Sequence, residues 1–259
     1  MLYGLYLSAA GVQTNSYRQD VIANNIANAE TVGFKRDLAL FQQRRTELQD
    51  RGLSPSRSNA LMEKLGGGVF ASPTIMDQSQ GELETTGRNL DVALFGPGYF
   101  TVSHGDQTGL TRDGRFIVNR QGNLAMADNE NREVLDVKGR PIHLEPTLET
   151  NIDKEGIVTQ KGPQIPMRQV GRVAVVDAPD PSLLNKSGAN LLTVSDPKQL
   201  RPAPNTLVRS EVQERANVDP TTEMAALMDA QRQLEANANM IRYQDQMLQK
   251  VCNDVGKIS

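Results

Sequence analysis

The sequence lacks several features that mark common classes of protein. It contains no tryptophan, six phenylalanines and five tyrosines, which leaves few large side chains for a deep core. Its single cysteine, Cys252, excludes an internal disulfide framework and a cysteine-rich zinc site. The net charge is −3. Nucleic-acid-binding proteins display a concentrated basic face, so this charge argues against a nucleic-acid partner.

Long apolar runs are also missing. No stretch of about 18 apolar residues occurs, so the sequence predicts no membrane insertion. The first residues lack the basic region and the continuous apolar region of a cleavable signal peptide. We therefore expect no cleaved signal peptide.

Proline is absent from both ends of the chain. All 13 prolines lie between Pro55 and Pro220, so the first 54 and the last 39 residues contain none. Proline removes a backbone donor and breaks helices. The distribution therefore predicts a helical N-terminal segment over 1–54, a different middle domain over 55–210, and a C-terminal helix within 211–259.

The N-terminal segment has a helical period. A line with alternating steps of four and three residues predicts one face of a helix over roughly residues 2–28. This line contains Tyr3, Leu7, Ala10, Thr14, Tyr17, Val21, Asn24 and Asn28. Asn24, Asn25 and Asn28 either cap carbonyl groups at the helix end or form hydrogen bonds across an interface. Gly33 permits a positive φ and is expected to end the helix, with Phe34 anchoring the turn.

The C-terminal segment shows a clearer pattern. Asp219, Pro220 and Glu223 are typical of a helix start. An apolar residue then recurs every seven positions, at Leu227, Leu234, Ile241, Leu248 and Val255. Met224, Met228, Ala238 and Val251 widen the stripe. A lone helix cannot bury such a stripe, so it needs a partner. Either the N-terminal helix closes a monomer as an antiparallel pair, or helices bundle between subunits.

The middle of the chain is typical of short antiparallel strands. Apolar or β-branched runs at 90–95, 98–102, 115–118 and 170–176 are separated by turn signals such as Gly96-Pro97-Gly98 and Asp113-Gly114. Their spacing predicts an all-β middle domain rather than βαβ units. The predicted fold class is therefore α+β, with a long helix at each end.

Few residues suggest catalysis. His104 and His143 have no metal-ligand spacing, and neither Gly66-Gly67-Gly68 nor Gly96-Pro97-Gly98 has the context of a phosphate loop. We expect Cys252 to be a buried or half-buried helix residue, since no histidine lies near it in sequence. The sequence therefore predicts no catalytic, cofactor-binding or metal-binding residue.

Paired carboxylates keep one enzymatic alternative open. Two turn-rich stretches, with Asp77, Glu82 and Glu84 and with Asp128, Glu130 and Glu133, could supply an acid–base pair. The alternative functions are thus a periplasmic or cell-surface carbohydrate-active enzyme and a monomeric binding module. Solvated surface residues are the more economical interpretation of both stretches.

Three ordered blocks resemble a known family. The first is Asn24-Asn25-Ile26-Ala27-Asn28 running into Thr31-Val32-Gly33-Phe34-Lys35, and the second is 81–100 followed by Leu110-Thr111-Arg112-Asp113-Gly114-Arg115-Phe116. The third contains Asn217-Val218, Glu223-Met224, Gln231-Arg232, Glu235-Ala236-Asn237 and Asp245–Leu248. Together they resemble the bacterial flagellar rod and hook axial proteins, with the proximal and the distal rod types both open.

The resemblance implies a structural subunit of the flagellar basal-body rod. Such a subunit passes through the flagellar export apparatus without a cleaved signal, and assembles helically in the periplasmic rod with copies of itself and other rod and hook axial proteins. The terminal helices would pair in a coiled-coil layer and transmit motor torque. The expected assembly interface consists of Tyr3, Leu7, Ala10, Tyr17, Val21, Asn24, Asn25, Asn28, Gly33, Phe34, Met224, Leu227, Gln231, Leu234, Asn237, Ile241 and Leu248.

Overall fold

The structure is a computed structural model that describes residues 2–43, 68–105, 107–163, 166–180, 183–188, 190–194, 200–203 and 206–256. The chain divides into two compact units. Unit 1 comprises Met1–Ala27, Asp37–Ile75 and Asp219–Ser259, and unit 2 comprises Asn28–Arg36 and Met76–Val218. This division differs from the three predicted segments, because two strands join the terminal helices and the segment after the first helix joins the strand-rich unit.

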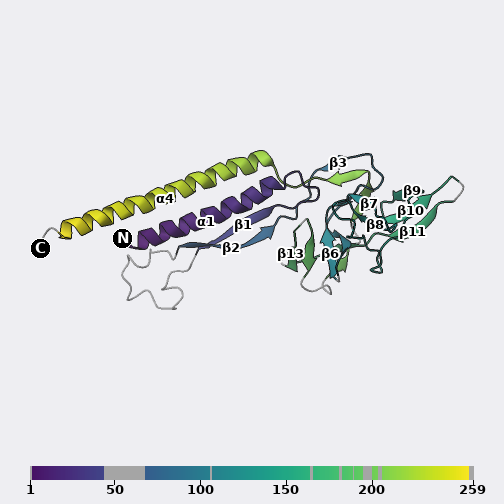
Figure 1. Ribbon diagram of the computed structural model, residues 1–259, viewed down its shortest axis with the longest axis horizontal. Coiled ribbons are helices and arrows are strands. Elements are labelled where there is room, and N and C mark those ends of the chain that lie inside the picture. The colour runs from purple at the N-terminus through teal and green to yellow at the C-terminus, as the bar shows by residue number, and fades with distance from the viewer. Residues whose placement is uncertain are drawn as a thin grey trace. The chain divides into compact units, whose positions relative to one another are not determined.

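Unit 1 contains the two predicted terminal helices, α1 (Leu2–Ala27) and α4 (Pro220–Gly256). They lie side by side and run antiparallel (Figure 1). Gly4 of α1 faces Gln244 of α4, and Gly11 faces Asn237. A Cβ atom added to either glycine would lie 2.7 Å from the facing amide nitrogen. The glycines therefore let the two helices approach closely.

Two glycines of α1 that the predicted line does not contain lie against α4. Gly4 and Gly11 follow Tyr3 and Ala10 of that line by one residue and face Gln244 and Asn237. Leu7 and Ala10 lie near Gly68, at the start of the second strand. An apolar pattern cannot reveal a contact face formed by glycines, because glycine has no side chain to contribute to the pattern.

The expectation for Cys252 was wrong, because its side chain is exposed. The register between Gly4 and Gln244 explains this, since α1 begins at Leu2 while α4 continues to Gly256. The last two turns of α4 therefore extend past the first described residue of α1. Within the described part of the chain, no helix is long and apolar enough to cross a membrane.

Asp219 caps the start of α4. Its Oδ1 accepts a hydrogen bond of 3.1 Å from the Thr221 amide, and its Oδ2 accepts one of 2.5 Å from the Thr222 hydroxyl. These bonds, the Thr222 hydroxyl first, lower the pKa of Asp219. The cap satisfies an amide that has no partner within the helix, as the sequence signals predict.

Asp219→Ala should therefore destabilise the start of α4, and Asp219→Asn should restore most of the loss because the amide oxygen still accepts. The folded-state pKa lies below the usual 3.8. The contribution of the cap is thus present above pH 3.8 and disappears as the pH falls through the folded-state pKa. Thermal melts followed by circular dichroism at neutral pH and below pH 3 measure both effects. An equal melting temperature for the Ala variant and the wild type at neutral pH would contradict the assignment.

Two strands complete unit 1. β1 (Asp37–Gln43) and β2 (Val69–Met76) form a two-stranded sheet. The buried Asn25 ties the last turn of α1 to the first residue of β1. Its Nδ2 donates to the Asp37 carbonyl at 2.9 Å, and its Oδ1 accepts from the Asp37 amide at 2.9 Å. This asparagine therefore fixes where the strand starts.

Unit 2 is built from short antiparallel strands, as predicted. Its largest sheet has six strands in the order β13-β14-β6-β5-β12-β15, and a three-stranded sheet has the order β11-β10-β9. The pairs β16-β4, β17-β3 and β7-β8 complete it. The strands are β3 (Leu83–Thr85), β4 (Val92–Phe95), β5 (Tyr99–His104), β6 (Gln107–Thr111), β7 (Phe116–Val118), β8 (Leu124–Met126), β9 (Glu149–Ile152), β10 (Ile157–Lys161), β11 (Arg168–Arg172), β12 (Val175–Asp177), β13 (Leu184–Lys186), β14 (Leu192–Val194), β15 (Arg201–Pro202), β16 (Leu207–Ser210) and β17 (Val212–Glu214).

The core of unit 2 needs few aromatic residues. Phe100 and Phe116 are fully buried and meet edge to face, with 5.2 Å between the ring centroids. Aliphatic residues from several strands, among them Leu94, Leu124 and Ile152, fill the rest of this core. The low aromatic content of the sequence therefore does not prevent a well-packed domain.

Candidate functional site: helix faces and a buried ion cluster

The expected interface residues of α4 divide into two sets. Leu227, Leu234, Asn237, Ile241 and Leu248 are half-buried. Met224 and Gln231 are exposed. The amide of Gln231 donates to Glu235 Oε1 at 3.2 Å along the helix.

The sequence reading missed further apolar residues on the exposed part of α4. Met240 and Met247 are 53% and 55% exposed, and Tyr243 is exposed as well, as is Met228 of the predicted stripe. By contrast, the line Arg232, Asn239 and Gln246 is polar and exposed. The described heptad residues Leu227, Leu234, Ile241 and Leu248 are half-buried, whereas Met240, Tyr243 and Met247 are exposed.

The expected interface residues of α1 have varied surroundings. Tyr3, Ala10 and Tyr17 are half-buried, Leu7 is exposed and Val21 is buried. Asn24 is exposed, while Asn25 makes the bonds to Asp37 described above, and Asn28, just past the end of α1, is half-buried. The asparagines therefore differ in role, although the sequence treats them alike.

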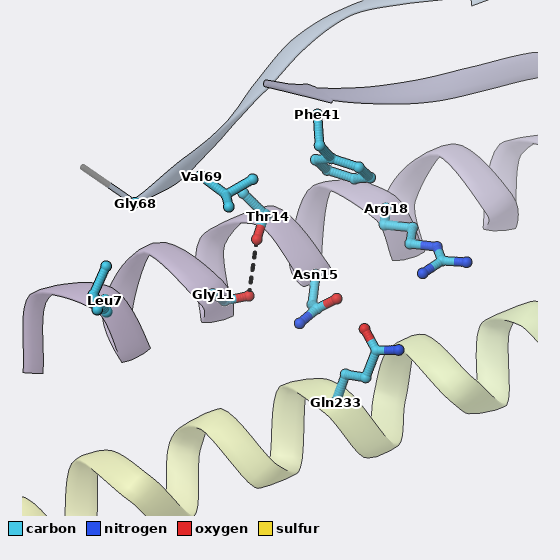
Figure 2. A pocket seen from close by; sticks show the side chains of 9 residues that line it. All are labelled: Leu7, Gly11, Thr14, Asn15, Arg18, Phe41, Gly68, Val69 and Gln233. Atoms are coloured by element: carbon cyan, nitrogen blue, oxygen red, sulfur yellow. Dashed lines mark hydrogen bonds between the residues drawn. The ribbon is translucent and has the colours of Figure 1, made fainter. Parts of the chain in front are cut away.

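A hollow of about 310 Å³ lies in unit 1 between α1, α4 and the start of β2 (Figure 2). Figure 2 shows Asn15 of α1 and Gln233 of α4 pointing toward each other, while the Thr14 hydroxyl donates to the Gly11 carbonyl at 3.1 Å. Its lining residues are Leu7, Gly11, Thr14, Asn15, Arg18, Phe41, Gly68, Val69 and Gln233. These residues include one cation and no carboxylate or histidine, so this hollow has no acid–base pair.

The segment from Asn28 to Arg36 belongs to unit 2 and contains three predicted residues, Asn28, Gly33 and Phe34. α1 ends at Ala27, six residues before Gly33, so the glycine forms the following turn instead of ending the helix. Its φ is +70°, as expected, and its amide donates to the Glu214 carbonyl at 2.7 Å. Phe34 is buried against Ala216 and Val218. Both residues therefore attach this segment to the chain just before α4.

The sequence reading missed a buried ion cluster beside this turn. Lys35 Nζ lies 2.6 Å from Glu214 Oε1, and Arg112 Nη1 lies 3.2 Å from Glu214 Oε2. The side chains of all three are 5% exposed or less. Lys35 and Arg112 lie in the first and second blocks that resemble rod proteins, and Glu214 lies three residues before Asn217 in the third. The only signal of this cluster in the sequence is that each block contains, or closely follows, one of these charged residues.

Burial dominates the electrostatics of this cluster. It lowers the pKa of Lys35, and the attraction of Glu214 only partly offsets it. Burial also raises the pKa of Tyr99 to about 12, although Arg112 lies 5.3 Å from the centre of its ring. Buried charges are tolerated only where partners and hydrogen bonds compensate them. The cluster is therefore a structural feature that depends strongly on each member.

A second set of polar contacts lies next to the cluster. The Arg36 amide donates to Asn217 Oδ1 at 2.8 Å, and Asn217 Nδ2 donates to the carbonyls of Asp77 and Ser79 at 3.0 and 3.1 Å. Arg36 Nε lies 2.8 Å from Asp77 Oδ2. Asn217 thus joins three chain segments through backbone groups.

Three of the carboxylates considered for catalysis, Asp77, Asp128 and Glu133, have structural partners. Burial acts to raise the pKa of Asp77, but hydrogen bonds from Ser79 and Arg36 outweigh it and the pKa is lowered. A general acid needs the opposite shift. Asp128 pairs with Arg132 at 2.9 Å, and Glu133 accepts from Asn119 and Asn123. In the described part of the chain, no cluster of three or more His, Cys, Asp or Glu could hold a metal ion.

Two family models match the two ends of the chain. The family described as "Flagella basal body rod protein" matches residues 5–35, and the one described as "Flagellar basal body rod FlgEFG protein C-terminal" matches residues 209–253. The former range includes Gly33 and Lys35, and the latter includes Glu214 and most of α4. The two matches therefore cover both helices and two members of the ion cluster.

Full-length relatives extend the similarity over the middle domain. The chain is 30% identical to the flagellar basal-body rod protein FlgG of Bacillus subtilis (strain 168), over 98% of this chain and 99% of the relative. It is 31% identical to the flagellar basal-body rod protein FlgF of Caulobacter vibrioides, over 98% of each chain. It is also 32% identical to the FlgG of the same organism, over 96% of this chain and 97% of the relative. The chain therefore belongs to the flagellar basal-body rod proteins, a family of structural subunits.

Proposed function

We propose that this structural rod subunit joins copies of itself and other rod and hook axial proteins through its terminal helices, and that the resulting helical assembly transmits motor torque. The observation that carries the proposal is the apolar surface of α4. A surface helix in a monomer normally exposes polar residues. Met240, Tyr243 and Met247 instead remain exposed after α4 has packed on α1.

The architecture of α4 supports contacts beyond its own chain. Its last two turns extend past the first described residue of α1, and Val251 there is 45% exposed. Long helices with an unburied apolar stripe gain most of their stability from a partner. A neighbouring subunit in a coiled-coil layer would supply one.

The surfaces of α1 and α4 also differ in chemistry. The exposed residues of α1 include the aromatic Tyr6 and the small Ala9, Ser16 and Ala23, whereas those of α4 include several methionines. A contact between unlike faces of two copies is heterologous, and a heterologous contact that does not close into a ring produces an open helical filament. Asn24, Asn28 and Gln231 are candidates for fixing the register of such contacts.

The localisation follows from the family. The relatives are named as flagellar basal-body rod proteins, which supports a place in the basal body for this chain. The finer proposal is a position in the periplasmic rod, reached through the flagellar export apparatus without a cleaved signal peptide. The carbohydrate-active alternative has no support in the carboxylates described above.

Two matched pairs of substitutions test the apolar surface. Met240→Glu with Met247→Glu should abolish incorporation into rods and swimming, because the interface would bury two unpaired carboxylates. Asn239→Glu with Gln246→Glu adds the same charge at the same spacing on the polar line and should leave both intact. All four positions are exposed, so each pair should change the free energy of unfolding by less than about 1 kcal/mol.

The measurements are swimming in soft agar, recovery of the subunit in isolated basal bodies, and denaturant unfolding of the purified chain. If cells with the methionine pair assembled rods and swam normally, α4 would not pack through this surface. Equal loss from both pairs would mean that added charge anywhere on α4 prevents assembly.

A further inference from the structure

Glu214 is the last residue of β17 and precedes α4 by only a few residues. Its carboxylate is fully buried and binds groups from three other parts of the chain. Oε1 accepts from Lys35 Nζ at 2.6 Å and from the Gly81 amide at 3.0 Å. Oε2 accepts from Arg112 Nη1 at 3.2 Å. One side chain thus joins segments that are far apart in sequence.

The backbone around Glu214 pairs with the segment that follows α1. The Gly33 amide donates to the Glu214 carbonyl at 2.7 Å, and the Asn217 amide donates to the Phe34 carbonyl at 3.3 Å. The Arg36 amide donates to the Asn217 side chain at 2.8 Å. Residues 33–36 therefore lie along residues 214–217. The chain that leaves α1 is attached directly to the chain that enters α4.

The charge in the cluster makes this attachment depend on Glu214. Two buried cations, Lys35 and Arg112, share its one carboxylate, and Arg112 Nε is buried without a hydrogen-bond partner. Lys35 Nζ also donates to the Ser79 carbonyl at 2.7 Å, but a carbonyl cannot neutralise its charge. Without Glu214, two like charges would remain buried near each other, which is strongly unfavourable.

We propose that Glu214 is a positioning residue that couples the two ends of the subunit, so that segment 28–36 keeps its place only while residues 212–217 keep theirs, and conversely. This coupling goes beyond assembly, because it acts inside one chain before any contact with a neighbour. It fixes the segment after α1 to the segment before α4, so that the two open and close together. The two buried cations make the coupling all-or-none: either segment can leave only by exposing the whole cluster.

Hydrogen exchange on the full-length chain tests the coupling. In Glu214→Gln, the amides of Gly33 and Asn217 should exchange at least about 100-fold faster than in the wild type. Both amides donate to backbone carbonyls, so the substitution removes neither acceptor and faster exchange reports coupling. The amides that pair β5 with β6 should change by less than about threefold, since a local opening leaves the core strands closed.

A second variant and a control separate coupling from general destabilisation. Lys35→Met, which keeps the Glu214–Arg112 pair, should also accelerate the exchange of the Gly33 and Asn217 amides. This variant tests the proposal even if Glu214→Gln does not fold. Adding Lys35→Met to Glu214→Gln should accelerate them by less than the product of the single effects, because both substitutions break the same contact. Glu84→Gln, on the neighbouring β3 and 3.9 Å from the exposed Arg215, should leave both amides unchanged.

Two results would overturn the proposal. In the first, Gly33 and Asn217 exchange at the wild-type rate in Lys35→Met. In the second, the β5–β6 amides accelerate as much as Gly33 and Asn217, which would make the cluster an ordinary part of the core. Neither result bears on the methionine surface of α4, so a failure here is distinguishable from a failure of the assembly proposal.

Discussion

Leu234→Pro should abolish rod assembly while leaving unit 2 folded. Leu234 lies near the middle of the 37-residue helix α4, with its side chain half-buried. Proline there removes the amide that bonds to the carbonyl four residues earlier, and its ring clashes with that carbonyl. The cost in a helix interior is about 3 kcal/mol or more. The second half of α4, which contains Met240, Tyr243 and Met247, would lose its alignment with the first half.

Three measurements check this prediction. Circular dichroism should report a loss of helix, hydrogen exchange should report unchanged protection in the β5–β6 strands, and basal bodies should lack the subunit. Leu234→Ala is the matched control: it removes apolar contacts but keeps the helix, at a cost of about 1–2 kcal/mol for a half-buried leucine. We expect the Ala variant to assemble. Swimming cells that carry Leu234→Pro would show that a continuous α4 is not needed.

The extent of the two helices could be predicted because its cause is local. Three local features predict them: the absence of proline from both ends, the cap at Asp219, and the apolar residue at every seventh position from Leu227 to Leu248. The antiparallel strands followed equally from turn residues and short β-branched runs. These features reflect backbone propensities, which neighbouring residues largely determine.

The part that Gly4 and Gly11 take in the contact of α1 with α4 could not be predicted, because glycine has no side chain. Gly4 and Gly11 set how closely α4 approaches, but a hydrophobic pattern follows only the residues that carry apolar atoms. The same limit explains the exposure of Cys252. The position at which α4 extends past α1 depends on the register between the two helices. The sequence pattern of one helix does not determine that register.

The ion cluster could not be predicted because its members are far apart in the chain. Lys35 and Glu214 are separated by 179 positions, and a charged residue in a turn is normally solvated. Tertiary packing alone brings the segment after α1 against the segment before α4. The sequence feature that came closest to indicating the cluster was Gly33 followed by Phe34. A glycine that permits a positive φ next to an aromatic residue predicts a tight turn at this place, but not the charges beside it.

Gly33→Ala should detach the turn after α1 from the segment before α4. Its effect on the free energy of unfolding is the second large effect that we expect. Gly33 has a φ of +70°, where a side chain costs about 1–2 kcal/mol. An added Cβ atom would also lie 2.5 Å from the carbonyl carbon of Arg112 and 2.7 Å from the Asp113 nitrogen. These are backbone atoms, which cannot rotate away, so either the turn or the backbone at Arg112 and Asp113 must move. We expect a total loss of more than about 3 kcal/mol in unit 2.

Gly87→Ala separates the two contributions. Gly87 has the same φ of +70°, but nothing lies within 4 Å of an added Cβ atom. Its substitution should therefore cost only the conformational part, about 1–2 kcal/mol. Denaturant unfolding of the two variants measures the difference, which is the cost of the contact between Gly33 and the Arg112 backbone. Equal losses would mean that the turn does not fit closely against Arg112. A larger loss at Gly33, with faster exchange of the Arg36 and Asn217 amides, would show that close fit at this one glycine holds the chain leaving α1 in place beside Glu214.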